Sequence, residues 1–208
     1  MKTYDYAKCA KYYRYLLLLV IPGIIVGLLT NERIVGSSPT VKTIGVILRI
    51  IINLVDAYFI YMLASEDERY KKSAILEVCI VVFNAANSFI PAEKISLKII
   101  ISLVGLAVGV FYAINFYPAN ADVLSGPDPA LSAKWHLIKK LFLILAALSC
   151  VSMMMLFAPL LAVLAVLAAS IMTLVVYIME LIALSRSSKA CALYAEAVGK
   201  PDADEPLN

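Results

Sequence analysis

The chain has 208 residues, of which 62% are hydrophobic and 16% are charged, and its formal net charge is +3. With a mean hydropathy of +0.89, this composition excludes a soluble domain, and no nucleic-acid partner is expected. The apolar runs are continuous rather than alternating, which excludes a transmembrane β-barrel. The sequence therefore predicts an all-α, polytopic membrane protein whose first partner is the lipid bilayer.

Six apolar runs are long enough to cross a membrane, because a bilayer core of about 30 Å takes about 20 helical residues to span. The predicted spans are about 15–30, 42–64, 73–90, 95–117, 137–157 and 160–184. They divide the chain into an interfacial segment over 1–14, a six-helix transmembrane domain over 15–184 and a cytoplasmic tail over 185–208.

The first elements in chain order are a basic and aromatic segment and an interrupted span. Residues 2–15 have the composition of an interfacial helix that lies against anionic headgroups, although a snorkelling flank explains it equally. Pro22 and Gly23 follow in the middle of the first span, where the proline removes a backbone hydrogen bond. They predict a kink, which is either a hinge or a tolerated bend.

The second span contains a polar stripe in an otherwise apolar stretch. Arg49, Asn53 and Asp56 follow one another at intervals of four and three residues, so they share one face of a helix. Ionisable groups at the centre of a span cost about 2.5–3.5 kcal/mol each on insertion scales. These side chains are therefore expected to face protein or water rather than lipid.

The third span carries a second stripe, Glu77, Asn84 and Asn87. The two spans run antiparallel, and a rise of about 1.5 Å per residue places Asn87 near the depth of Arg49. We predict a polar seam between the second and third spans, with the cation toward the outside and the two carboxylates toward the cytoplasm.

The later elements carry weaker signals. The connection 118–134 is rich in Pro, Gly, Ala and Asp, and it is expected to be a cytoplasmic loop. Small residues recur at four-residue spacing in several spans, including the fourth and sixth, and such Gly- and Ala-rich faces allow close packing within the protein or with a membrane-protein partner. Glu180 is expected near the cytoplasmic end of the last span, where its side chain can snorkel to the headgroups.

The distribution of basic residues predicts the orientation. Thirteen Lys and Arg residues flank the spans on the side of the termini, four lie on the other side, and Arg49 is intramembrane. By the positive-inside rule both termini are cytoplasmic, giving an N-in/C-in topology. A plasma membrane, specifically a bacterial inner membrane, is the expected location.

No catalytic motif, phosphate-binding loop or metal-ligand spacing is present in the sequence, so we expect neither enzymatic activity nor a cofactor or metal. The polar seam favours a small carrier, or the solute-binding subunit of a transport system, acting on a small polar solute. The alternative is a non-transporting accessory, sensor or toxin-immunity protein in which the same residues form a structural network. A carrier requires a cavity around Arg49, Asp56 and Asn84, whereas the alternative requires these side chains to be packed and fully hydrogen-bonded.

Overall fold

The computed structural model describes residues 4–29, 39–91, 93–154 and 159–198, and this part of the chain is helical apart from short turns. The helices are α1 (Tyr6–Leu29), α3 (Pro39–Met62), α4 (Glu68–Phe89), α5 (Ile95–Leu124), α6 (Pro129–Met154) and α7 (Pro159–Val198). Each of these six contains a stretch long and apolar enough to cross a membrane. The prediction of an all-α protein with six helices able to span a membrane is thus confirmed.

The helices form a ring in chain order. Each helix packs on the next one along the chain, and α7 returns to pack on α1 and close the ring; across the interior, α5 and α7 make only a minor contact. In a ring of six helices with neighbouring axes about 8–10 Å apart, the centre is about as wide as another helix. Large side chains must fill this central space, or it remains open.

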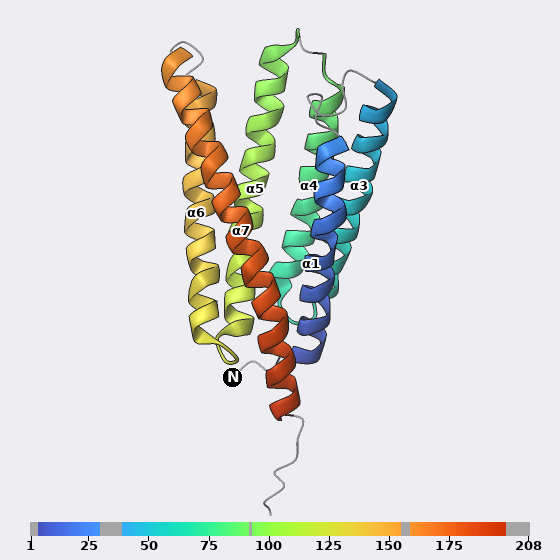
Figure 1. Ribbon diagram of the computed structural model, residues 1–208, viewed down its shortest axis with the longest axis vertical. Helices are drawn as coiled ribbons and strands as arrows, with labels where there is room; N and C mark the ends of the chain where they lie inside the picture. Colours follow the sequence, from blue (N-terminus) through green and yellow to red (C-terminus); the bar gives the residue numbers. More distant parts are fainter. Residues whose placement is uncertain (1–3, 30–38, 92, 155–158, 199–208) are drawn as a thin grey trace, which may run out of the picture.

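The ring is filled at one end only. We call the end that carries Tyr6 of α1 and Val198 of α7 the terminal end, and the opposite end the distal end. Figure 1 shows the helices drawn together at the terminal end and spread apart toward the distal end. The largest fully buried side chains include Tyr13, Tyr70 and Trp135, which belong to the terminal halves of their helices. These aromatic side chains form the floor of the ring.

The helices extend further than the predicted spans, mainly at the terminal end. α1 begins at Tyr6, so most of the predicted interfacial segment forms its first turns, and Cys9 and Tyr13 there are fully buried. α7 continues through Val198, and its 40 residues are about 60 Å long at 1.5 Å per residue, twice the thickness of a bilayer core. The predicted tail is therefore helical as far as Val198, and 199–208 lies outside the described residues.

Packing between α1 and α7 explains these extensions. Cys9 and Cys191 are both fully buried in the same cluster, and the Ser188 hydroxyl donates a hydrogen bond of 2.9 Å to the Ala10 carbonyl. The sequence predicts an interfacial segment over 1–14 and a cytoplasmic tail over 185–208; the structure adds that small residues in both segments pack the two helices together beyond the apolar stretch.

The connection 118–134 also differs from the predicted loop, because α5 continues through Pro118 to Leu124 and α6 begins at Pro129. Residues of α5 on both sides of the proline are buried at helical spacing, among them Tyr117 and Asn120. The buried face extends past Pro118, and its contacts outweigh the backbone hydrogen bond that a proline removes.

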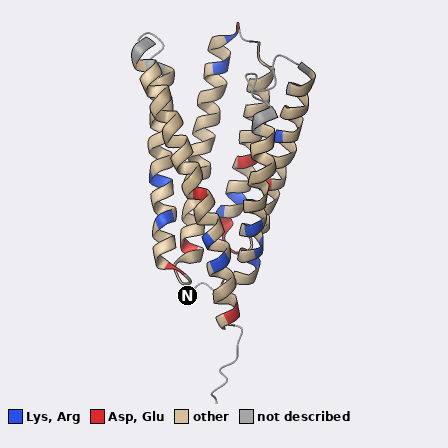
Figure 2. Cartoon of the chain, viewed as in Figure 1, with Lys and Arg blue, Asp and Glu red and all other residues tan. Residues whose placement is uncertain are grey.

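The outer surface is mostly apolar. Large hydrophobic side chains are exposed along every helix, and the share of each candidate span that is buried inside the bundle is 28% or less. Most of the charged residues of the described helices lie toward the terminal end (Figure 2). An apolar exterior with a charged end is the pattern expected of a bundle whose solvent is lipid.

Candidate functional site

The first cavity lies between α1, α3, α4 and α7 and has a volume of about 740 Å³. Arg49, Asn53 and Asp56 of α3 all line it, because their spacing turns one face of the helix toward the interior of the ring. A polar stripe that faces a cavity avoids the cost of contact with lipid.

The second stripe approaches the first at the interface between α3 and α4. Asn84 and Asn87 of α4 line the first cavity together with the α3 residues. Arg49, Asn53 and Asn84 also surround a narrow gap of about 20 Å³ between the two helices. The structure thus brings five of the six predicted site residues to a single cavity.

Helix α1 forms one wall of this cavity and has a glycine, Gly23, at the middle of that wall. Gly23 lines the cavity, and a Cβ atom built on it would meet no other atom within 4 Å. The absence of a side chain at this position therefore widens the cavity. It does not serve to bring two helix backbones into close contact.

The charged groups of the first cavity lack protein partners. Within the described ranges, neither Arg49 nor Asp56 forms a hydrogen bond or an ion pair. They are seven residues apart on one helix, a rise of about 10.5 Å, so they cannot pair with each other. Asn87 donates to the Ser102 hydroxyl at 3.4 Å, whereas its buried Oδ1 has no donor. The hydrogen-bonding capacity of Arg49 and Asp56 is thus available to a bound molecule.

Glu77, the sixth predicted residue, lines a different cavity. This second cavity lies between α4, α5, α6 and α7 and has a volume of about 510 Å³. Asn84 and Asn87 line both cavities and therefore mark their border. The residues of the α4 stripe do not all line the same cavity, because α4 lies between the two cavities. Positions along its polar face therefore border one cavity or both.

Sequence reasoning missed Glu180, which it placed at the membrane boundary. The structure places Glu180 on the wall of the second cavity, together with Glu77 and two tyrosines, Tyr112 and Tyr117. Glu77 lies within Coulombic range of both Glu180 and Asp56. Glu180 lies 21 residues after Pro159, the first residue of α7, and the sequence could not show that it faces this cavity, because that depends on how α7 packs against its neighbours.

The carboxyl groups do not form a metal site. Among the residues that the structure describes, no group of three or more His, Cys, Asp or Glu side chains is arranged to hold a metal ion. The four cysteines are all free.

The floor beneath both cavities is held by polar contacts between helices. The Tyr70 hydroxyl donates to Asn120 Oδ1 at 2.7 Å and lies 2.8 Å from the Tyr13 hydroxyl. Nearer the surface, the Arg69 guanidinium bridges Asp67 and Asp122, which connects the start of α4 to the end of α5. These contacts join α1, α4 and α5 below the cavities.

Comparisons with protein-family models, with curated proteins and with solved structures find no match to this chain. The chemistry of the site is therefore derived from its own residues.

Proposed function

We propose that this protein is a small membrane carrier, or the solute-binding subunit of a transport system, and that it binds a small polar solute in the first cavity. The observation that carries the proposal is a cavity of about 740 Å³ that is lined by Arg49, Asn53, Asp56, Asn84 and Asn87. Its volume falls within the range of about 300–1,000 Å³ that is usual for small-molecule sites.

The residues of the cavity have distinct chemical roles in this proposal. Arg49 binds an anionic group of the solute, since a guanidinium presents a planar set of donors that fits a carboxylate or phosphate. Asn53 and Asn84 supply amide donors and acceptors that orient the solute. Asp56 takes up a proton or a cation, which keeps its charge balanced when the site is empty of solute.

The absence of partners for Arg49 and Asp56 favours a carrier over an accessory protein. An unpaired charge inside a membrane costs about 2.5–3.5 kcal/mol on insertion scales, and a structural network would recover part of this cost by hydrogen bonding. Within the described part of the chain neither group has such a bond, so a bound solute and water are the available partners.

We place the terminal end in the cytoplasm of a bacterial plasma membrane, with both termini inside. In the sequence, thirteen basic residues flank the predicted spans on the side of the termini and four flank them on the other side, which supports that orientation. A membrane-impermeant maleimide applied to intact cells should label Glu93→Cys, in the connection between α4 and α5, and should not label Glu196→Cys, near the end of α7. Labelling of Glu196→Cys alone would reverse the orientation.

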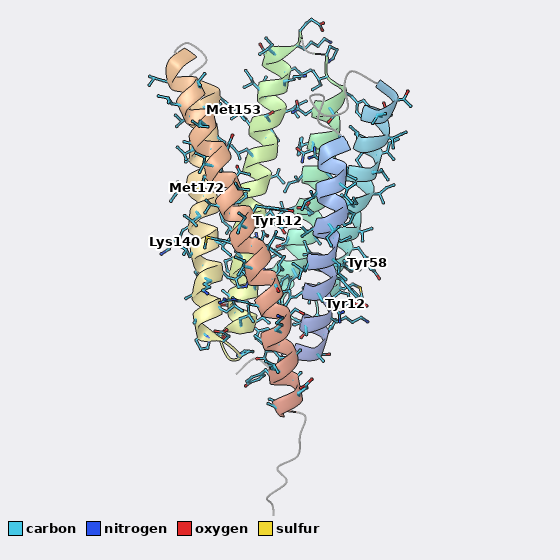
Figure 3. The ribbon with its side chains drawn as sticks, in the orientation of Figure 1. Tyr12, Tyr58, Tyr112, Lys140, Met153 and Met172 are labelled. Carbon is cyan, nitrogen blue, oxygen red and sulfur yellow. The ribbon has the colours of Figure 1, made fainter. Side chains whose placement is uncertain are left out.

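The site is tested by solute retention. Wild type, Arg49→Gln and Asp56→Asn are purified in mild detergent, and small molecules extracted from each are compared by mass spectrometry; small carboxylates and phosphates are also screened for thermal stabilisation. Lys140→Gln is the matched charge control, because Lys140 is exposed on the outer side of α6 (Figure 3). We expect wild type and Lys140→Gln to retain or respond to the same anionic solute, and Arg49→Gln to lose it. Equal retention and equal stabilisation in all four proteins would refute the proposed site.

A further inference from the structure

The second cavity has walls of a different chemical character from the first. Two carboxyl groups, those of Glu77 and Glu180, line it together with the aromatic rings of Tyr112, Tyr117 and Phe142. No Lys or Arg is among the described residues that line it. Tyr112 lies near the middle of the bundle (Figure 3), so this wall is deep within the ring.

The carboxyl groups of this cavity have no cationic partner. Glu77 forms neither a hydrogen bond nor an ion pair in the described ranges, and the carboxyl groups of Asp56 and Glu180 lie within Coulombic range of it. A carboxylate inside a membrane must either carry a proton or meet a positive charge. Since the cavity wall supplies no positive charge, a ligand can supply it. An ammonium group suits the two carboxylates, because it carries hydrogen-bond donors and no acceptor.

The ring of Tyr112 adds an attraction for the same kind of group. Tyr112 is half-buried and lines the cavity, whereas Tyr117 is buried and its ring stacks on Trp135. Aromatic faces attract cations, most strongly where water is excluded. The rings also provide apolar surface for the carbon skeleton of an amine.

We infer that the second cavity binds the ammonium group of a small organic amine, between Glu77 and Glu180 and against the ring of Tyr112. This inference rests on the proposed carrier function and narrows its solutes to molecules that carry an amine. The same ammonium chemistry occurs in a free amine and in the headgroup of phosphatidylethanolamine.

The probe is 2-phenylethylamine, and its uncharged counterpart 2-phenylethanol is the control ligand. Binding to the purified, delipidated protein is measured by calorimetry and by fluorescence. Trp135 is the single tryptophan of the chain, and its ring stacks on Tyr117 with centroids 5.9 Å apart, so its emission reports occupancy of the cavity. We expect the amine to bind at least roughly tenfold more tightly than the alcohol, because only the amine compensates the carboxylates.

Four variants test this site. Glu77→Gln and Glu180→Gln should each weaken amine binding by roughly tenfold or more, since each removes one charge of the site. Glu93→Gln makes the same change at an exposed position outside the cavity and should leave the Kd unchanged, as should Lys140→Gln on the outer side of α6. The probe carries no anionic group, so loss of anionic-solute retention and loss of amine binding are measured separately, and failure of the proposed function is distinguishable from failure of this inference. Unaltered Trp135 emission in the unliganded variants shows that each one is folded.

Equal affinity for amine and alcohol, unchanged affinity in both Glu variants, or no saturable binding of the amine would each overturn the inference. Mixed micelles that contain phosphatidylethanolamine identify the source of the ligand. Competition by phosphatidylethanolamine, and not by phosphatidylglycerol, assigns the cavity to a lipid headgroup. Amine binding that is unaffected by both lipids assigns it to a free amine.

Discussion

The hydroxyl of Tyr70 joins three helices at the floor of the ring, and its removal is the sharpest test of how this floor is held. Tyr70 donates to Asn120 Oδ1 on α5 at 2.7 Å, and the Tyr13 hydroxyl on α1 is 2.8 Å away. Because the Tyr70 proton is used toward Asn120, Tyr13 must donate to Tyr70. All three residues are fully buried, so water cannot replace a lost partner.

The expected cost follows from the groups that Tyr70→Phe leaves behind. It removes two hydrogen bonds and leaves a buried amide oxygen and a buried hydroxyl unpaired, which we expect to cost about 2–4 kcal/mol of the free energy of unfolding. Tyr13→Phe removes one bond and leaves Tyr70 still donating to Asn120, so it should cost about 1 kcal/mol. The double variant should cost no more than Tyr70→Phe alone, because it also removes the unpaired Tyr13 hydroxyl.

Unfolding by sodium dodecyl sulfate in mixed micelles, followed by the emission of the buried Trp135, measures these differences. Tyr58→Phe is the matched control, since Tyr58 is 56% exposed on the outer face of α3 and should lose less than about 0.5 kcal/mol. A Tyr70→Phe variant as stable as Tyr58→Phe would refute the role of the hydroxyl. Additive losses in the double variant would refute the order of donors.

Three further changes test other parts of the structure. Gly23→Leu places a side chain where no atom lies within 4 Å; we expect stability to be unchanged or raised by about 0.5–1 kcal/mol, and retention of an anionic solute to be lost in the mass-spectrometric assay. Ser187→Ala removes the acceptor, 3.0 Å away, of the Trp135 indole N–H; a loss of about 1–3 kcal/mol is expected in the detergent titration, and unchanged stability would show that the indole has another partner. Asp67→Ala removes the N-cap of α4 and should lower the free energy of unfolding by about 1–2 kcal/mol. Asp122→Ala changes a side chain that is 49% exposed and should lower it by less than about 1 kcal/mol. A larger loss for Asp122→Ala than for Asp67→Ala would refute the cap as the dominant contact.

The number and type of helices could be predicted because lipid leaves the backbone few options. A run of about 20 apolar residues in a membrane must be helical and must span, whatever its neighbours are. The terminal extensions could not be predicted in the same way. Tyr13 and Cys191 are in segments of mixed composition, and whether these segments are interfacial or packed depends on contacts between α1 and α7 that are distant in sequence.

The candidate site was predictable in part for a related reason. Arg49, Asn53 and Asp56 share a helix face by spacing alone, and a polar face in a membrane must turn inward. Which cavity Glu77 lines depends instead on the order of the helices in the ring, because this order places α4 between the two cavities. The contact of Glu180 with the second cavity depends likewise on which face α7 turns toward α4, α5 and α6.

The two cavities follow from the way the ring is filled. Aromatic side chains such as Tyr70 and Trp135 occupy the centre near the terminal end, whereas the lining of the first cavity includes Gly23 and the short amides Asn53 and Asn84, which are too small to fill a space as wide as a helix. Larger apolar side chains at these positions would close the space and increase packing. The bundle instead leaves Arg49 beside an open volume. An unpaired charge there costs about 2.5–3.5 kcal/mol on insertion scales. This cost is a sizeable part of the free energy of unfolding of a typical folded domain, which is about 5–15 kcal/mol. A bound solute that pairs with Arg49 offsets this cost, so occupancy of the first cavity should stabilise the bundle.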